Sequence, residues 1–226
     1  MLPLRDTIQS KKAPVITWMI ILLNALVFLY EIRLPSADLS NLINEYGLIP
    51  SRLNILIPTT WLPLITHMFL HGGWLHFLSN MWILFVFGDN IEDRLGKTRY
   101  LLFYLIGGAS AGIIQSIFGH SDIPAVGASG AIAAILGAYF LFFPTARIIT
   151  LIPIFIFPWF VRIPAIIFLG LWFMTQLWSG LISMATSDGV QMGGVAWWAH
   201  IGGFVVGFFM ALPSLMMTKK KTTYSY

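Results

Sequence analysis

Long apolar runs, separated by short polar segments, divide the chain into candidate membrane-spanning helices. An α-helix needs about 20 mostly apolar residues to cross the hydrocarbon core of a bilayer. The pattern predicts six such helices, at about 15–30, 74–87, 100–118, 128–143, 164–181 and 197–217. The apolar stretch 148–182 is too long for one span, and Pro153, Pro158 and Arg162 interrupt its first half. We therefore begin the fifth helix at Pro164, since proline fits the first turn of a helix, and expect an all-α membrane bundle.

The first apolar run has two interpretations. It follows Arg5, Lys11 and Lys12, as the apolar part of a signal peptide would. However, the residues after it are Tyr30-Glu31-Ile32-Arg33, which contain no small-residue cleavage site. We interpret the run as a retained membrane helix.

The composition excludes several classes of protein. Of the 226 residues, 58% are hydrophobic and 10% are charged, whereas an average soluble domain has about 25% charged residues. A soluble globule could not cover this much apolar surface with so few charges, and a disordered chain would be far more polar. The sequence has no cysteine, which excludes disulfides, Cys-ligated metal and a Cys nucleophile within it.

The distribution of Lys and Arg predicts the orientation. If the N-terminus is cytoplasmic, six spans place all the basic residues except Arg33 and Arg52 on the cytoplasmic side, as the positive-inside rule favours. The net charge of +4 then reports topology and contact with anionic lipid, not binding to nucleic acid. We expect a cytoplasmic segment at 1–14, a six-helix core at 15–217 and a basic cytoplasmic tail at 218–226.

The segment 34–66 is a long connection on the predicted outer side. It combines prolines and acidic residues with apolar pairs such as Trp61-Leu62. This amphipathic mixture indicates partial immersion in the membrane interface. We see no internal repeat and no second domain.

Strongly polar residues inside three predicted spans are candidates for a functional site, because such groups are costly in a membrane. They are His76 and Asn80 in the second span, Ser129 in the fourth and His200 in the sixth. These spans run in the same direction, and each polar group lies near its outer end, roughly 6 Å below it at about 1.5 Å per residue. The four side chains should therefore lie at one depth.

Small residues indicate which of these helices touch. His200, Gly203 and Gly207 lie on one face of the sixth helix. The fourth helix has small residues near its serine: Gly130, Ala134, Gly137 and Ala138. Patterns of this kind let two membrane helices approach closely. That approach would bring the Ser129 hydroxyl within reach of the His200 ring, as a nucleophile with its general base.

Ser129 also begins a helix, where backbone N–H groups lack partners and attract negative charge. With His76 and Asn80 as further donors, the site could stabilise the oxyanion of acyl transfer, where one donor is worth roughly 3–4 kcal/mol. No Asp or Glu lies in the outer half of a span. The sequence therefore favours a Ser–His dyad over a triad.

Other interpretations of these residues remain open. The Gly-x-Ser-Gly sequence could be only a packing motif, and the histidines could only bridge helices by hydrogen bonds. His67 and His71 have the spacing of a helical zinc pair, but no Glu stands between them as in His-Glu-x-x-His, and we expect neither metal nor cofactor. A small transporter or proton channel could use His76 and His200, although the lower halves of the fourth and sixth helices are apolar.

Together these residues form an ordered set of four motifs that resembles the rhomboid family of intramembrane serine proteases. The motifs are His71 to Asn80 (HGGWLHFLSN), Glu92 to Gly96 (EDRLG), Gly127 to Ala131 (GASGA) and Ala199 to Gly203 (AHIGG). The resemblance implies a six-helix rhomboid bundle. It also implies a serine endopeptidase that cleaves single-span membrane proteins in or near their transmembrane segment.

The resemblance assigns roles to individual residues. Ser129 would be the nucleophile and His200 the general base, with an oxyanion hole at His76, Asn80 and Gly127. Gly203 and Gly130 would be structural residues near the site. The segment 34–66, the fifth helix and the loop 183–196 look like the family's outer loop, substrate gate and cap. Glu92 and Arg94 look like its inner polar cluster.

One position departs from some members of the family. Four residues after the nucleophile they carry an aromatic side chain that packs against the catalytic histidine, and here this residue is Ala133. Another side chain must then pack against His200.

We expect a multi-pass protein of the cell membrane, in a bacterium or another prokaryote. Its partners would be single-span membrane proteins as substrates and membrane lipids. The alternative is a non-catalytic rhomboid-like protein that binds membrane clients.

Overall fold

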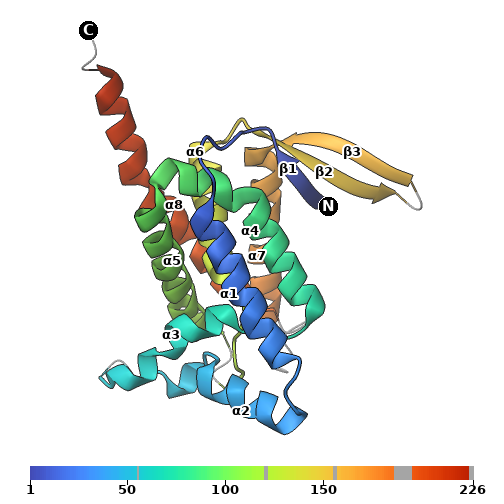
Figure 1. The fold of residues 1–226 in the computed structure, drawn as a ribbon, viewed down its shortest axis with the longest axis vertical. Coiled ribbons are helices and arrows are strands. Elements are labelled where there is room, and N and C mark those ends of the chain that lie inside the picture. Colours follow the sequence, from blue (N-terminus) through green and yellow to red (C-terminus); the bar gives the residue numbers. More distant parts are fainter. Residues whose placement is uncertain (55, 120–121, 155–156, 186–194, 224–226) are drawn as a thin grey trace.

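Helices form most of the protein in its computed structural model, which describes residues 1–54, 56–119, 122–154, 157–185 and 195–223 (Figure 1). The long helices are α1 (Val15–Glu31), α4 (Trp74–Leu95), α5 (Lys97–Phe118), α6 (Ser129–Phe142), α7 (Ala165–Ala185) and α8 (Trp197–Thr223). The shorter helices α2 (Ser36–Tyr46) and α3 (Pro63–Thr66) lie across one end of the bundle, together with 3₁₀ turns at Pro50–Arg52, Pro58–Trp61 and His67–Phe69. Most of the predicted cap loop, at 186–194, lies outside the described residues, as do 224–226 of the predicted tail.

A helix lies at each of the six positions that the apolar runs predict, but the ends differ. Three are long and apolar enough to cross a membrane: α5, α7 and the part of α8 from Trp197 to Leu215. α1 and α6 are apolar but shorter, with 17 and 14 residues. α4 continues past its predicted end at Phe87, and charged residues such as Asp89 and Glu92 occupy its last two turns. The count of six spans and the side of the termini stay predictions.

The protein is mostly helical, as expected, but a sheet of three antiparallel strands, which the all-α expectation did not include, accompanies the helices. Its strands are β1 (Leu2–Asp6), β2 (Arg147–Ile154) and β3 (Phe157–Pro164), in the order β1-β2-β3. β2 and β3 occupy the interrupted first half of the apolar stretch. Proline breaks a helix, whereas in this hairpin Pro153 pairs with Pro158 across the two strands. β-branched residues such as Ile148 and Val161 also favour strands.

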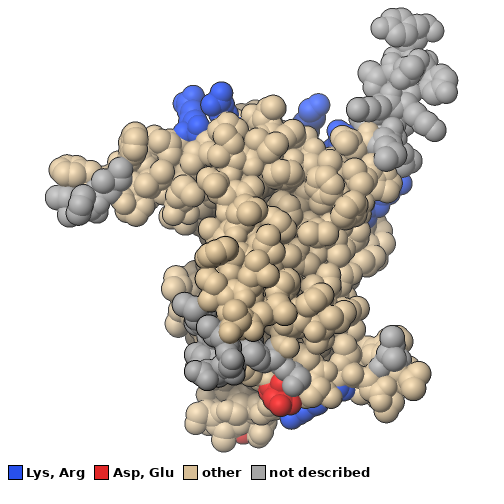
Figure 2. Space-filling view, turned by 180° about the vertical axis from the view of Figure 1, so that it is seen from behind, with Lys and Arg blue, Asp and Glu red and all other residues tan. Residues whose placement is uncertain are grey.

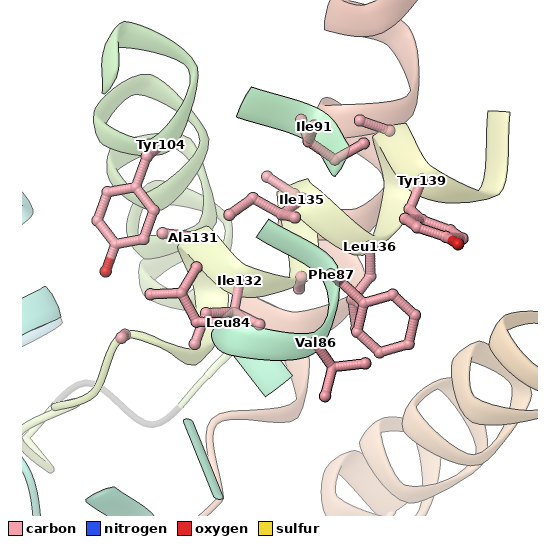
Figure 3. Close-up of a cluster of buried hydrophobic side chains, with 14 of the residues drawn as sticks. Leu84, Val86, Phe87, Ile91, Tyr104, Ala131, Ile132, Ile135, Leu136 and Tyr139 are labelled. Carbon is pink, nitrogen blue, oxygen red and sulfur yellow. The ribbon is translucent and has the colours of Figure 1, made fainter. Parts of the chain in front are cut away.

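α6 is the centre of the packed core. Every residue from Gly130 to Tyr139 is buried, so this helix is covered on all sides. Its most extensive contact is with α8, and α5, α4 and α7 surround the rest. Figure 3 shows the apolar layer between α6 and α4, where Leu84 and Phe87 meet Ile132 and Leu136.

Small residues allow α6 and α8 to touch backbone to backbone, which confirms the predicted close approach. A Cβ atom added at Gly203 would overlap the carbonyl oxygen of Gly130, and one at Gly207 would overlap the backbone of Ala134. Gly137 meets the backbone of Phe204 in the same way. This interface fixes the start of α6 against the start of α8.

A buried carboxylate joins α1 to the far end of α4. Glu92 accepts hydrogen bonds from the backbone N–H groups of Ile16, at 3.0 Å, and Thr17, at 2.8 Å. The Thr17 hydroxyl donates to the same carboxylate at 2.9 Å. Glu92 thus satisfies the free N–H groups at the N-terminus of α1, a structural role.

Candidate active site

The starts of α4, α6 and α8 surround a cavity of about 730 Å³ at the end of the bundle that α2 and α3 cross. His76, Asn80, Ser129 and His200 all line it. The cavity is also lined by Gly72 and Gly73 before α4, by 124–126 before α6 and by 195–196 before α8. The structure therefore brings the four predicted side chains to one space.

Gly127 determines how the loop before Ser129 meets α4. Its φ of +122° lies in a region that residues with a side chain rarely adopt. A Cβ atom there would lie 2.6 Å from the His76 ring and 3.5 Å from Nδ2 of Asn80. The Gly127 N–H donates to the carbonyl oxygen of His67 at 2.8 Å. Glycine is therefore needed for both the backbone conformation and the space, and it places the serine loop directly beside His76 and Asn80.

Asn80 presents an unused donor. Its side chain is 6% exposed, and among the described residues Nδ2 has no hydrogen-bond partner. A buried amide without a partner is costly, and such groups in a folded protein often have a functional reason. Because Asn80 lines the cavity beside the serine loop, its amide is available to a negatively charged oxygen there.

His200 lies in the first turn of α8, and buried glutamines act on both its backbone turn and its ring. The N–H of Ala199 donates to Oε1 of Gln115 on α5 at 3.0 Å. The ring atom Nδ1 of His200 lies 2.8 Å from Oε1 of Gln176 on α7. The rings of Trp172 and Trp197 lie 6.0 Å and 6.2 Å from the His200 ring, between centroids.

These side chains pack against His200 in place of the aromatic side chain that position 133 lacks. Gln176 and Trp172 come from α7 and Trp197 from α8, so the neighbours of His200 replace an aromatic on α6. Ala133 itself is fully buried, and its Cβ lies 3.1 Å from where a Cβ of Gly203 would be. A large side chain there would push α8 away from α6. The sequence carries one signal for Gln176, an amide inside a very apolar helix, but the predicted set of site residues does not include it.

Ser129 and His200 line the same cavity, at the starts of two helices that touch backbone to backbone. A Cβ atom added to Gly130 would lie 3.6 Å from the Cβ of Ala199, so α6 and α8 are in direct contact beside the site. No hydrogen bond joins the Ser129 hydroxyl to the His200 ring within the described part of the chain. Catalytic hydrogen bonds are often long before substrate binds.

The structure describes two further histidines near the site, His67 and His71. Nδ1 of His67 lies 2.6 Å from the carbonyl oxygen of Pro63, and burial lowers the pKa of His67 to about 4. His71 is 3% exposed, and its backbone N–H donates to the carboxylate of Glu31. Within the described residues, no group of three or more His, Cys, Asp and Glu side chains could hold a metal ion.

Comparison with known proteins identifies the family of the chain. A sequence model of the Rhomboid domain matches residues 58–216. RHOMBOID-like protein 4 of Arabidopsis thaliana is 33% identical over 156 residues, which are 68% of this chain and 34% of that protein. The chain therefore belongs to the rhomboid family, as its motifs predict.

Two bacterial relatives are named as proteases. Rhomboid protease GluP of Bacillus subtilis is 36% identical over 127 residues, 55% of this chain and 24% of that protein. Putative rhomboid protease YdcA of the same species is 42% identical over 83 residues, 35% of this chain and 40% of that protein. The chain spans less than half the length of these relatives.

Proposed function

We propose that the protein is an intramembrane serine endopeptidase that cleaves single-span membrane proteins in or near their transmembrane segment. The observation that carries this proposal is the shared cavity, in which Ser129, His200, His76 and Asn80 meet at the starts of three helices. The names of the two Bacillus subtilis relatives support the same reaction class.

The chemistry follows from the positions of these groups. His200 removes the proton of the Ser129 hydroxyl as the oxygen attacks the substrate carbonyl carbon. The carbonyl oxygen becomes an oxyanion, which the Ser129 N–H, Asn80 and His76 stabilise. When the C–N bond breaks, His200 gives the proton to the leaving amine. Water, deprotonated by His200, then releases the acyl group and restores Ser129.

The membrane imposes a condition on the substrate. A helical carbonyl already accepts a hydrogen bond within its helix. The substrate must therefore unwind locally before its amide reaches Ser129, and small or helix-breaking residues near the cleavage site should help. We propose that the cavity opens to the outer side, so that water reaches it.

We further propose six spans with both termini in the cytoplasm of a prokaryotic cell, with 1–14 and 218–226 flanking the core at 15–217. The distribution of charge supports this orientation. On the face that Figure 2 draws, Lys and Arg gather mostly at the end that carries the sheet, opposite the cavity. Because the chain has no cysteine, single cysteines introduced at either end can be tested for labelling from each side of the membrane.

The proposed activity is tested with a fluorophosphonate probe on detergent-purified protein. We expect wild type to be labelled and Ser129→Ala not to be labelled, since the probe reacts with an activated serine. His200→Ala should be labelled poorly because the hydroxyl loses its base. Ser79→Ala is the matched control, because Ser79 lines the same cavity but only donates to the carbonyl oxygen of His76, at 3.0 Å.

Labelling of Ser129→Ala equal to that of wild type would exclude the mechanism. Cleavage of a panel of single-span substrates by wild type, absent for Ser129→Ala, would extend the result to proteolysis. Client binding without labelling or cleavage would favour the non-catalytic alternative.

A further inference from the structure

The hydrogen bonds of Gln176 fix which way its amide points. Nε2 donates to Oγ1 of Thr175 at 3.0 Å and to the carbonyl oxygen of Trp172 at 3.3 Å. The Thr175 hydroxyl itself donates to the carbonyl oxygen of Trp172 at 2.6 Å, so its oxygen is free to accept. Oε1 therefore points to the His200 ring, 2.8 Å from Nδ1.

An amide oxygen only accepts hydrogen bonds, so Nδ1 of His200 must carry the proton. In the neutral ring Nε2 then keeps its lone pair. This is the tautomer that a general base needs if Nε2 is to take the proton of Ser129. Gln176 is 6% exposed, so water does not compete strongly for the bond.

We propose that Gln176 is a positioning residue that holds His200 in the reactive tautomer and orientation, in the place where a triad would have an acid. The inference rests on the proposed protease function. It also joins the base to α7, the helix that the family resemblance marks as the substrate gate. Outward movement of α7 would break the hydrogen bond between Gln176 and His200. The His200 ring is therefore fully oriented only while α7 packs against α8.

The test compares Gln176→Leu, Gln176→Glu and Gln115→Leu. Gln115 is a matched control, because it is equally buried and bonds the same turn of α8, but through the backbone of Ala199 and not the His200 ring. The rate of fluorophosphonate labelling is measured from pH 5 to pH 9, together with the unfolding temperature.

We expect Gln176→Leu to slow labelling by roughly ten- to hundred-fold, because Nδ1 loses its acceptor. Gln176→Glu should restore labelling and move the acid limb of the pH–rate profile upward by about one pH unit, since a carboxylate favours the imidazolium. Gln115→Leu should lower the unfolding temperature without moving the acid limb.

A purely structural role for Gln176 predicts a lower unfolding temperature, an unchanged profile and no rescue by Gln176→Glu, and would overturn the inference. The Ser129→Ala control separates this outcome from failure of the proposed function. If wild type is labelled at Ser129 and Gln176→Leu reacts at the same rate, only the role of Gln176 is wrong.

A second inference concerns the hairpin of β2 and β3, and it does not depend on proteolysis. From Leu151 to Val161 the sequence has eleven consecutive residues without a polar side chain. Three aromatic residues in this part are largely exposed, Phe157 at 71%, Trp159 at 58% and Phe160 at 60%. Exposed apolar surface of this kind marks an interaction site.

The position of the hairpin indicates its partner. β3 ends at Pro164 and the long apolar helix α7 begins at Ala165, so the hairpin leaves the bundle at the level where that helix begins. It extends sideways from the bundle (Figure 1). Ile166 and Ile167 at the start of α7 are also exposed, at 47% and 51%, so the helix that follows the hairpin exposes apolar surface as well.

We infer that the distal half of the hairpin lies in the membrane, at the boundary of headgroups and acyl chains. Aromatic side chains favour this zone. Arg147 and Arg162, at the end of the hairpin nearest the bundle, are exposed and can interact with anionic lipid headgroups. The outer edge of β3 has unpaired backbone groups, which would be too costly deep in the hydrocarbon. The hairpin should therefore lie shallowly.

The absence of cysteine allows a direct test with Trp159→Cys and, as the control, Arg162→Cys. Each variant is labelled with an environment-sensitive dye and placed in liposomes of phosphatidylcholine and phosphatidylglycerol. We expect the dye at 159 to emit at shorter wavelength than the dye at 162. It should be quenched more by lipids with a nitroxide near the headgroup than by lipids with one near the chain end.

Equal emission at both positions with no lipid quenching would overturn the inference. A shorter wavelength at 159 that depends on protein density in the liposomes, without lipid quenching, would assign the surface to a second copy of the chain instead.

Discussion

At the scale of single residues, the candidate site contains a glycine that cannot be replaced without strain and a buried amide with an unused donor. Gly127 is constrained twice, by its φ of +122° and by the His76 ring, 2.6 Å from where a Cβ would be. Asn80 is the opposite case, a buried amide whose Nδ2 has no partner among the described residues. The fold therefore bears the cost of an unsatisfied donor, which a developing oxyanion would remove.

The unsatisfied donor predicts that Asn80→Ala slows the reaction without lowering the stability of the fold. We expect the rate of fluorophosphonate labelling to fall by about 10²- to 10³-fold, as for loss of one oxyanion donor. The unfolding temperature should stay the same or rise, because Nδ2 loses no hydrogen bond. Ser79→Ala, one residue away, should change neither value. Unchanged labelling of Asn80→Ala would show that this amide does not act on the reacting oxygen.

At the scale of elements, the contact of α6 with α8 aligns the serine and the histidine. The contact depends on backbone surfaces without side chains at Gly137, Gly203 and Gly207. Gly207 lies about two turns from His200, so a change there tests the alignment without touching the site.

We expect Gly207→Ala to lower the free energy of unfolding by about 1–3 kcal/mol, since its Cβ would overlap the backbone of Ala134. Labelling of Ser129 should slow as well, because α8 must shift. Gly170→Ala is the control, as the nearest atom to its Cβ would be Phe140 Cε2 at 3.9 Å. Denaturant titration in detergent measures both variants, and an equal effect of the two would contradict the role of the interface.

The elements also show what the sequence could reveal. Polar residues at one depth and stripes of small residues predicted the shared cavity and the contact of α6 with α8. The hairpin was missed because a continuous apolar run has no periodicity, so strand and helix look alike in it. Gln176 was missed because its partner, His200, is 24 residues away along the chain and meets it only through packing of α7 on α8.

At the scale of the whole molecule, buried titratable groups at the two ends have opposite effects on stability. Burial lowers the pKa of His67 and of His71 from 6.5 to about 4. The unfolded chain then binds protons that the folded protein does not, so stability is lost as pH falls from about 6.5 to about 4. Burial raises the pKa of Asp6, on β1, from 3.8 to about 6. That carboxyl takes up its proton earlier in the folded protein, so it adds stability as pH falls through the same range.

The contributions of His67 and Asp6 can be separated by unfolding temperatures measured from pH 4 to pH 8. We expect His67→Gln to flatten the loss of stability below pH 6.5, because an amide can donate to the Pro63 carbonyl oxygen without titrating. Asp6→Asn should act in the opposite sense and steepen that loss, since the stabilising protonation is removed while the neutral side chain still accepts from the Tyr139 hydroxyl. His67→Gln with the slope of wild type would mean that protonation of His67, whose carbonyl oxygen accepts from the Gly127 N–H, does not cause the loss of stability.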